Sequence, residues 1–400
     1  MRTPPEALSE ILARAAPLDE ELVSLSDALG RVLSRPVRAG RSLPPWDNAA
    51  MDGYAVRARE VVPGVPLTVQ GVVAAGQVGP PLAPGSALRI MTGAPLPEGA
   101  DAVIMREEAT EEGGRVRFVR SPRPGDHVRR RGEDVAEGSE VLAAGAEIGP
   151  GEVGLLAALG RTLVEVHRRP QVSILSTGDE LVPADRPLGP GQIVGSNAHA
   201  LCAQVVQAGG LPRMVPFLPD DPEALRVGFG AALQADVVLS SGGVSVGEFD
   251  HVKEVLVGLG VQQHFWQVAM KPGKPLSFGT RQGVLVFGLP GNPASSMVSF
   301  ELFVRPALRR MLGLPPSAAV RPRVPVRLRT PLQPDRRRVH FVRARLERAS
   351  DGVLWAQPAA QQGSGMLRSM VGIHALLEVP PGEARLEPET ELIAHLLVMV

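Results

Sequence analysis

The spacing of hydrophobic positions divides the chain into regions of different character. Between residues 42 and 134, short β-forming runs are separated by Gly and Pro turns, which predicts a small β module. From residue 171, short apolar runs alternate with longer amphipathic stretches, which predicts βαβ units and a parallel sheet with both faces covered. From residue 318 the chain returns to strands and turns, which predicts a β barrel or a sandwich.

The same pattern predicts the individual elements. In the β module we expect strands over residues 67–73, 87–91, 102–105 and 116–119. In the α/β region we expect strands over residues 172–175, 213–217, 237–239 and 262–268, and helices over residues 197–207, 222–233, 251–259 and 293–312. Further helices are expected at residues 4–16, 26–34 and 150–159, with a strand at 163–166. The β module is therefore expected to interrupt a helical segment.

Composition narrows the classes of function. The 42 basic residues balance 42 acidic residues, so no net charge favours nucleic acid or an anionic membrane. The first 30 residues carry acidic side chains throughout, and no apolar run is long enough to span a membrane. The single cysteine, Cys202, excludes an internal disulfide and a cysteine-based zinc site. These features predict a soluble protein of the cytoplasm.

The chain uses very little lysine and asparagine. Its only lysines and asparagines are Lys253, Lys271, Lys274, Asn48, Asn197 and Asn292. We expect such residues mainly where arginine or aspartate cannot replace them. They are therefore candidates for a functional site, although Lys253 lies on a predicted helix surface and is expected to be ordinary.

Candidate chemistry follows the predicted strands, because ligands of open α/β sheets bind beyond the carboxyl ends of the strands. The loop Ser240-Ser241-Gly242-Gly243 follows one of them. Paired glycines and the next helix N-terminus favour phosphate, although a plain strand-to-helix turn needs the same glycines. The loop lacks the spacing of a nucleotide P-loop, which disfavours ordinary ATPase chemistry.

Two lysines and two acids complete this group. Lys271 and Lys274 flank Pro272-Gly273, and a compact ammonium suits a crowded oxyanion site better than a broad guanidinium. Solvated surface lysines are the alternative. Asp220 and Asp250 offer the oxygen ligands that Mg²⁺ prefers, although both also fit helix capping.

The β module holds a second cluster. Residues 46–55 contain two acids, a rare asparagine and the only tyrosine, Tyr54, although Asp52-Gly53 also fits a simple turn. Residues 129–134 set three arginines against two acids, which fits a salt-bridged domain junction at least as well as a site. The eight histidines show no metal-ligand spacing, and no nucleophile elbow or dinucleotide fingerprint occurs. Hydrolase and dinucleotide-binding functions therefore lack support.

In their order along the chain, these motifs resemble one family, the molybdopterin molybdenumtransferases (MoeA and the E domains of gephyrin and of the plant cofactor proteins). The matching stretches are PPWDNAAMDGYAVR at 44–57, RIMTGAPLPEGADAV at 89–103, RRRGEDV at 129–135, STGDEL at 176–181, PDDP at 219–222, ADVVLSSGGVSVGEFD at 235–250, KPGKPLSFG at 271–279 and GLPGNPASS at 288–296. The C-terminal region matches more loosely, through Phe341-Val342-Arg343 and Gln362-Gly363-Ser364.

The resemblance implies an α/β multidomain protein with four modules. These are a helical dimerisation segment (1–41 and 135–169), an inserted β module (42–134), a doubly wound molybdopterin-binding α/β domain (170–315) and a C-terminal β barrel (316–400). It implies a homodimer whose active clefts combine the α/β domain of one subunit with the β module of the other. It also implies a reaction: adenylylated molybdopterin and molybdate give molybdenum cofactor and AMP, with Mg²⁺. The molybdopterin adenylyltransferase is the expected protein partner.

The resemblance also implies roles for particular residues. The residues expected to be needed for catalysis are Asp52, Thr92, Asp134, Glu180, Lys271 and Lys274. The residues expected to bind substrate are Ser176, Thr177, Ser241, Gly242, Gly243, Ser245, Gly247, Pro290, Gly291, Asn292, Pro293, Ser295, Arg343 and Ser364. Among these, the lysines, Ser295, Arg343 and Ser364 match the oxyanion-handling positions. Asp220 and Asp250 match acids near the metal.

The sequence departs from the family pattern at one position, and three alternative functions remain open. Gln267 follows Phe265-Trp266 where the family often has lysine, which removes a positive charge near the anionic cleft. The alternatives are the adenylyltransferase that makes the adenylylated substrate, a non-catalytic scaffold, and insertion of tungstate instead of molybdate. The motifs at 44–57 and 129–135 favour the molybdenumtransferase over the adenylyltransferase.

Overall fold

The chain folds into two units, which are described separately. The computed structural model describes residues 1–242 and 251–398. The first unit, called the large unit below, comprises Met1–Leu22, Gly30–Ser34 and Glu165–Val400. The second, called the insert unit, comprises Val23–Leu29 and Arg35–Val164.

A six-stranded sheet forms the centre of the large unit. Its strands, in the order β16-β13-β17-β21-β20-β18, are β16 (Leu211–Met214), β13 (Gln171–Ser176), β17 (Val237–Ser241), β21 (Val284–Leu289), β20 (Ser277–Arg281) and β18 (Gln262–Phe265). The first four run parallel, as predicted, but β20 pairs antiparallel with both β21 and β18. The expected parallel sheet therefore contains one antiparallel strand, β20. The β20–β21 hairpin, whose turn residues Gln282 and Gly283 have φ values of 49° and 88°, was not predicted.

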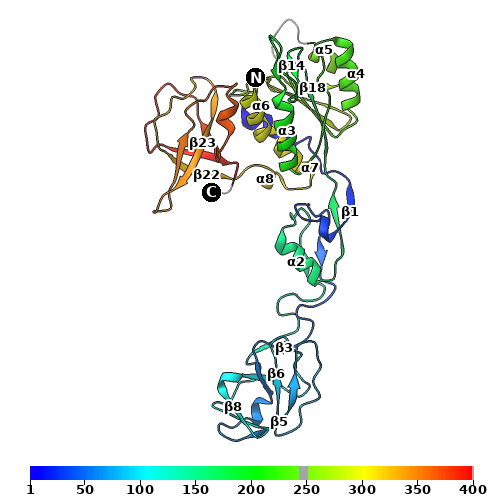
Figure 1. Cartoon of the computed structure of the whole chain (residues 1–400), viewed down its shortest axis with the longest axis vertical. Helices are drawn as coiled ribbons and strands as arrows, with labels where there is room; N and C mark the ends of the chain where they lie inside the picture. The colour runs from blue at the N-terminus through cyan, green and yellow to red at the C-terminus, as the bar shows by residue number, and fades with distance from the viewer. Residues whose placement is uncertain (243–250, 399–400) are drawn as a thin grey trace. The chain divides into compact units, whose positions relative to one another are not determined.

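Helices cover both faces of this sheet, as the alternating pattern predicted. One face carries α1 (Pro4–Leu12), α3 (Ser196–Gln207), α6 (Pro293–Ser299) and α7 (Arg305–Met311), and the other carries α4 (Pro222–Ala232) and α5 (Val252–Gly258) (Figure 1). The π-helical segment Phe300–Val304 joins α6 to α7. Alternate residues of each strand face opposite ways: Leu239 and Phe287 join the first core, whereas Val238 and Val286 join the second.

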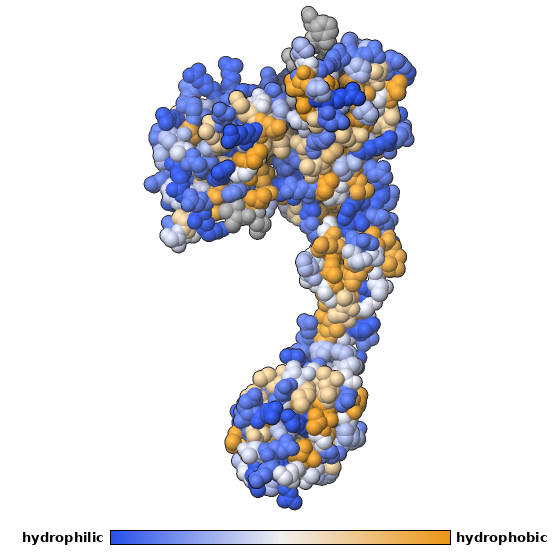
Figure 2. Space-filling view, in the orientation of Figure 1, coloured by the Kyte–Doolittle hydropathy of each residue, from blue (hydrophilic) through white to orange (hydrophobic). Residues whose placement is uncertain are grey.

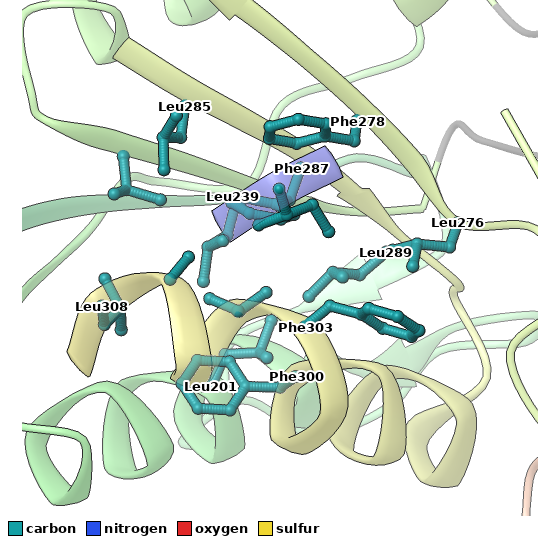
Figure 3. Packing of buried hydrophobic residues seen from close by; sticks show 14 of the residues in the cluster. Leu201, Leu239, Leu276, Phe278, Leu285, Phe287, Leu289, Phe300, Phe303 and Leu308 are labelled. Carbon is teal, nitrogen blue, oxygen red and sulfur yellow. The ribbon is translucent and has the colours of Figure 1, made fainter. Parts of the chain in front are cut away.

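Figure 3 shows the larger core, where Phe278 and Phe287 of the sheet face Phe300 and Phe303 of the helical layer. All four side chains are at most 1% exposed. Each contributes roughly 2 kcal/mol of hydrophobic stabilisation. This core fixes β17 and β21 against α6, and so fixes the loops that follow those strands.

The rest of the large unit is a closed β barrel. Strands β22 (Arg323–Leu328), β23 (Val339–Arg348), β24 (Leu354–Pro358), β25 (Ala375–Val379) and β26 (Glu391–Leu396) form its wall, and the β23–β25 pairing closes it. The short strand β19 (Met270–Lys271) adds to β23 in parallel. Small elements of this unit include β14 (Leu181–Val182), β15 (Ile193–Val194) and α8 (Pro316–Ala319). The barrel prediction is confirmed.

The insert unit is built on a six-stranded sheet. In the order β7-β4-β6-β5-β9-β8, its strands are β7 (Ala102–Met105), β4 (Gly53–Val56), β6 (Ser86–Ile90), β5 (Leu67–Val73), β9 (Arg115–Phe118) and β8 (Ala109–Glu112). Two small ladders pair β2 (Val37–Arg38) with β11 (Glu140–Leu142) and β3 (Asn48–Ala49) with β10 (Val128–Arg129). The unit also contains helix α2 (Pro150–Ala158). Strands β1 (Glu20–Ser24) and β12 (Leu163–His167) lie where the chain passes between the two units.

The helix expected at residues 26–34 does not form. The chain has a single 3₁₀ turn at Leu25–Asp27, and Gly30 then adopts a φ of 73°. Leu33 bridges to Val166 in an antiparallel β contact. The apolar stripe that suggested a helix therefore belongs to extended chain, because Gly30 breaks the helical path. Among the described residues, no helix is both long and apolar enough to cross a membrane.

Glycine is required at position 53, where β4 pairs with β7. Gly53 is the first residue of β4, so Asp52-Gly53 does not form the simple turn that was the alternative. A Cβ atom at Gly53 lies 1.9 Å from the carbonyl oxygen of Ile104, which is backbone and has no room to move. We expect Gly53→Ala to destabilise the insert unit by at least about 3 kcal/mol. Thermal unfolding measures this, with Gly40→Ala as the control, because a Cβ at Gly40 has no neighbour within 4 Å. Equal stability of the two variants contradicts the prediction.

Candidate functional site

A pocket of about 170 Å³ opens at the carboxyl ends of β13, β17 and β21 in the large unit. It gathers eight of the residues predicted from the sequence: Ser176, Thr177, Glu180, Ser241, Gly242, Gly291, Asn292 and Pro293. These residues come from three loops that are far apart in the chain. The parallel register of β13, β17 and β21 brings the three loops together.

The floor of this pocket has hydroxyl groups available for a ligand. Ser176 and Thr177 are buried, and their hydroxyl oxygens have no hydrogen-bond partner among the described residues. Gly242 has a φ of 98°, and a Cβ atom there lies 2.8 Å from the carbonyl oxygen of Thr177. Glycine is therefore required at 242, and its backbone lies against the pocket floor. Buried unpaired hydroxyls are uncommon and fit groups that bind a ligand.

Asn197 holds two sides of the pocket together. Its Nδ2 donates to Ser241 Oγ at 2.8 Å and to the carbonyl oxygen of Gly291 at 2.7 Å. The rare asparagine count pointed to this residue, but the sequence analysis did not place it among the site residues. Aspartate at this position has no N–H to donate, which explains why asparagine is retained.

Three carboxylates lie beside the pocket. The backbone N–H of Asp220 donates to Asp179 Oδ1 at 3.3 Å, and Glu180 lines the pocket. Partial burial, together with the negative charges of Asp179 and Glu180, raises the pKa of Asp220. Such crowding favours a bound cation. Among the described residues, however, no group of three or more such ligands is close enough to hold a metal alone.

Of the two adjacent aspartates before α4, only Asp221 caps the helix. Asp221 caps α4 by accepting from the backbone N–H of Ala224 at 2.8 Å, and no hydrogen bond of the Asp220 side chain occurs among the described residues. Asp220 is therefore available for another role. The predicted site residues Gly243, Ser245, Gly247 and Asp250 lie outside the described residues.

The barrel contributes a loop to the same region. Asn292 Nδ2 donates to Ser364 Oγ at 3.1 Å, and the backbone N–H of Ala294 donates to the carbonyl oxygen of Ser364 at 3.0 Å. Ser364 therefore meets the beginning of α6 through its side chain and its backbone. Two predicted residues from the α/β and barrel regions are thus joined directly.

Arg343 is the most unusual charge in the large unit. Its side chain is fully buried at 0% exposed, and its Nε and Nη1 have no partner among the described residues. Nη2 donates to the carbonyl oxygens of Gly363, at 3.2 Å, and Gln361, at 3.5 Å. Burial lowers the pKa of Arg343 to about 10. A buried cation without a carboxylate is costly, so this arrangement fits an anion.

Lys271 lies beside β23, the strand that carries Arg343. The strand predicted at residues 262–268 ends at Phe265, and Lys271 belongs to β19, which pairs with β23 of the barrel. Its Nζ lies 3.7 Å from Asp335 Oδ2. Lys271 therefore follows the carboxyl end of a central strand, as expected, but that strand ends three residues earlier than predicted. The pairing of Lys271 with the barrel was not predicted.

His340 lies opposite Lys271 in this ladder. It is buried, and neither ring nitrogen has a partner among the described residues. Burial and the charges of Lys271 and Arg343 lower its pKa to about 4, so the ring is neutral at physiological pH. No sequence signal separated this histidine from the seven others. The structure identifies it only through burial.

The remaining predicted residues of the large unit are less tightly connected. Lys274 is exposed, and its carbonyl oxygen accepts the backbone N–H groups of Val268 and Leu276. Pro290 is buried just after β21, and Ser295 is buried in the first turn of α6. Both therefore support the loop that carries Asn292.

The insert unit holds its own pair of predicted residues. Asp52 Oδ1 accepts the backbone N–H and the hydroxyl of Thr92, each at 2.7 Å. These hydrogen bonds lower the pKa of Asp52 and keep it ionised. Asp134 is exposed in the same unit, and its backbone N–H donates to the carbonyl oxygen of Leu43. The sequence motifs at 44–57 and 89–103 thus meet at Asp52 and Thr92.

The arginines of this unit form ion pairs. Arg130 Nη1 lies 2.7 Å from Asp47 Oδ2, and Arg131 Nη2 lies 3.1 Å from Glu137 Oε2. These two arginines are therefore salt-bridged, as one alternative expected, but the ion pairs lie within the insert unit and not at a domain junction.

Comparison with known proteins identifies the family. The MoeA N-terminal region (domains I and II) matches residues 2–160, a probable molybdopterin-binding domain matches residues 173–310, and the MoeA C-terminal region (domain IV) matches residues 325–397. The chain belongs to the MoeA family. The resemblance seen in the motifs is confirmed across the whole chain.

Individual relatives agree with this assignment. A molybdopterin molybdenumtransferase of Nostoc is 40% identical over 91% of this chain and 86% of its own length. A protein of the same name from Bacillus subtilis is 36% identical over 91% and 86% of the two chains. The crystal structure of a molybdopterin biosynthesis MoeA protein from Pyrococcus horikoshii superposes with a TM-score of 0.84 at 31% identity, covering 99% of this chain and 100% of that one. The fold class predicted from the sequence is confirmed.

Proposed function

We propose that this chain is a molybdopterin molybdenumtransferase, which inserts molybdate into adenylylated molybdopterin and releases AMP. The observation that carries the proposal is Arg343, a fully buried guanidinium that has two unpaired nitrogens and no carboxylate partner within the described part of the chain. Through Gly363 and Ser364 it is linked by hydrogen bonds to the pocket residue Asn292. An anion site thus adjoins a pocket lined with hydroxyls and glycines, as a reaction between an oxyanion and a phosphorylated pterin requires.

The pocket suits the phosphorylated substrate. Ser176, Thr177 and Ser241 offer hydroxyls, and Gly242 and Gly291 allow the substrate to approach the backbone closely. We assign Lys271, Lys274, Arg343, Ser295 and Ser364 to the oxyanion. These side chains neutralise the charge of molybdate and hold it beside the pterin, so catalysis rests on positioning and electrostatics.

We assign Asp52, Thr92, Asp134 and Glu180 to the reaction as well. Among these, Asp52 and Thr92 are held to each other by two hydrogen bonds of 2.7 Å. Such a fixed carboxylate can orient a substrate group without changing its own protonation near neutral pH.

The proposal includes a homodimer formed through the insert unit. Within α2, which the structure describes in full, Leu156 is the only buried residue although the helix is largely apolar. Leu29 and Leu163 are 58% and 51% exposed. Figure 2 shows apolar surface over the segment that carries α2. An exposed apolar surface of this kind favours association with a second copy.

Mg²⁺ is proposed as the cofactor, with Asp220 and Asp250 as protein ligands and substrate phosphates completing the coordination. We expect Asp220→Asn to raise the Mg²⁺ concentration for half-maximal activity by about tenfold, because one anionic ligand is lost. Titration of activity with Mg²⁺ measures this. The control is Asp221→Asn, which keeps a good helix cap at the adjacent position. An unchanged Mg²⁺ dependence in Asp220→Asn removes Asp220 from the metal site.

Reconstitution with purified adenylylated molybdopterin tests the proposed function. We expect molybdenum cofactor to form when molybdate is added and not when it is omitted. Replacing molybdate with tungstate in a parallel reaction measures the choice of oxyanion. If the protein instead consumes MgATP without molybdate, it is an adenylyltransferase, and if it only dimerises, it is a scaffold. We place the reaction in the cytoplasm, with the molybdopterin adenylyltransferase as the partner that supplies the substrate.

A further inference from the structure

The side chain of Gln362 is bonded to the strand that carries Arg343. Its Oε1 accepts the backbone N–H of Arg343 at 3.1 Å, and its Nε2 donates to the carbonyl oxygens of Arg343 and Ala359, each at 2.9 Å. One side-chain amide therefore imitates a neighbouring strand on both the donor and the acceptor side of Arg343. Within residues 1–242 and 251–398, the hydrogen-bonding partners of the Gln362 side chain are all backbone groups.

These bonds set the position of the next two residues. Gly363 supplies a carbonyl oxygen to Arg343 Nη2 at 3.2 Å, and Ser364 meets Asn292 at 3.1 Å and the backbone N–H of Ala294 at 3.0 Å. Gln362 thus ties its own loop to β23, and the residues on either side of it, Gln361 and Gly363, supply the carbonyl oxygens that hold the guanidinium. Without it, the loop is attached to β23 by the Ala359 N–H bond to the Arg343 carbonyl and by the guanidinium itself.

The result is a buried guanidinium that is hydrogen-bonded at one nitrogen and unpaired at the other two among the described residues. Nη2 is occupied by carbonyl oxygens, whereas Nε and Nη1 have no partner among the described residues. If the carbonyl oxygens of Gln361 and Gly363 shifted, the Arg343 side chain would lose its hydrogen bonds at Nη2 and gain rotamer freedom. The directions of its Nε and Nη1 donors would then no longer be fixed. Preorganisation of the donors is what makes such a site bind an anion strongly.

We propose that Gln362 is a positioning residue of the oxyanion site, which acts through Arg343 by fixing the loop at residues 361–364. The proposal rests on the assignment of Arg343 to the oxyanion. In this role Gln362 acts through the backbone groups to which it is bonded and not through the substrate. Its three backbone bonds determine where the donors of Arg343 point and where Ser364 meets the pocket.

The test compares two substitutions that differ chemically at the same position. Gln362→Met keeps the length of the side chain and removes all three hydrogen bonds. Gln362→Glu keeps the shape but places a carboxylate oxygen against the carbonyl oxygens of Arg343 and Ala359. Gln357→Met is the matched control, since Gln357 lies in the same barrel and its Nε2 donates to Thr330 Oγ1 and the Pro358 carbonyl, not to Arg343.

We expect the affinity for molybdate, measured by calorimetry on the full chain, to fall about tenfold in Gln362→Met and not in Gln357→Met. Gln362→Glu is expected to bind molybdate still more weakly, because its carboxylate repels the carbonyl oxygens of Arg343 and Ala359 and so displaces the loop from β23. In activity assays, KM for molybdate rises in Gln362→Met while kcat at saturating molybdate stays within about twofold of wild type. A purely structural role predicts lower thermal stability with no selective loss of molybdate affinity.

The outcomes separate this proposal from the proposed function. If the wild-type protein binds no molybdate, the assignment of the oxyanion site itself fails. If wild type binds molybdate and both Gln362 variants bind it as well as Gln357→Met does, only the positioning role is overturned. If either Gln362 variant unfolds at the assay temperature, the other is measured, and all variants are compared below their unfolding transitions.

Discussion

Arg343→Met is expected to abolish molybdate-dependent product formation while leaving the protein at least as stable as wild type. Removing a preorganised donor from a site of developing charge reduces kcat by at least about 100-fold. The stability expectation has the opposite sign, because a buried, unpaired guanidinium costs free energy that an apolar side chain of similar length does not. Thermal unfolding and the reconstitution assay, made on the same preparation, measure the two effects.

The control for this experiment lies two residues away on the same strand. Arg345 is exposed, and no ion pair of its side chain occurs among the described residues. Arg345→Met is therefore expected to retain nearly full activity. If Arg343→Met is strongly destabilised and loses activity only in proportion to the fraction unfolded, the guanidinium has a structural role. Arg343 is then not a ligand of the oxyanion.

The double substitution Lys271→Ala, Lys274→Ala is expected to reduce molybdate-dependent activity by at least about 1,000-fold, since it removes both lysines that we propose for the oxyanion site. Folding should be little affected. Asp335 keeps its ion pair with Arg338 at 3.0 Å when Lys271 is removed, and Lys274 is exposed. Initial rates at several molybdate concentrations measure the loss.

The third lysine provides the control. Lys253 Nζ lies 5.1 Å from the centre of the Trp266 ring and has no predicted role in the site. We expect Lys253→Ala to keep at least half of the activity, because an exposed cation–π contact contributes only about 0.5–1 kcal/mol to stability. Activity lost equally in Lys253→Ala and in the double variant points to a general effect of surface charge and counts against a specific lysine site.

Many of the residues that line the pocket could be predicted from the sequence, because they lie at the ends of regular strands. Ser176, Ser241 and Gly242 come directly at or after parallel strands, so the rule for open α/β sheets placed them at one edge without knowledge of side-chain contacts. The structure confirmed that edge. The rare asparagines were a second signal, and Asn197 and Asn292 both make bonds that aspartate has no N–H to provide.

The remainder depended on information that local pattern does not carry. The β20–β21 hairpin was missed because its two turn residues, Gln282 and Gly283, are a weak turn signal beside long apolar runs. The pairing of Lys271 with the barrel strand β23 was not predicted, because a two-residue strand such as β19 has no periodicity to read. The burial of Arg343 and His340 arises from barrel closure and from loop packing, which are tertiary events.

The most direct test of the central claim is the amount of AMP released per molybdenum bound by the wild-type protein. Purified protein is mixed with adenylylated molybdopterin, with and without molybdate, and both AMP and protein-bound molybdenum are measured. The account predicts that AMP release requires molybdate and reaches about one AMP per molybdenum inserted. AMP release that is equally fast without molybdate, or molybdenum insertion without AMP release, contradicts it.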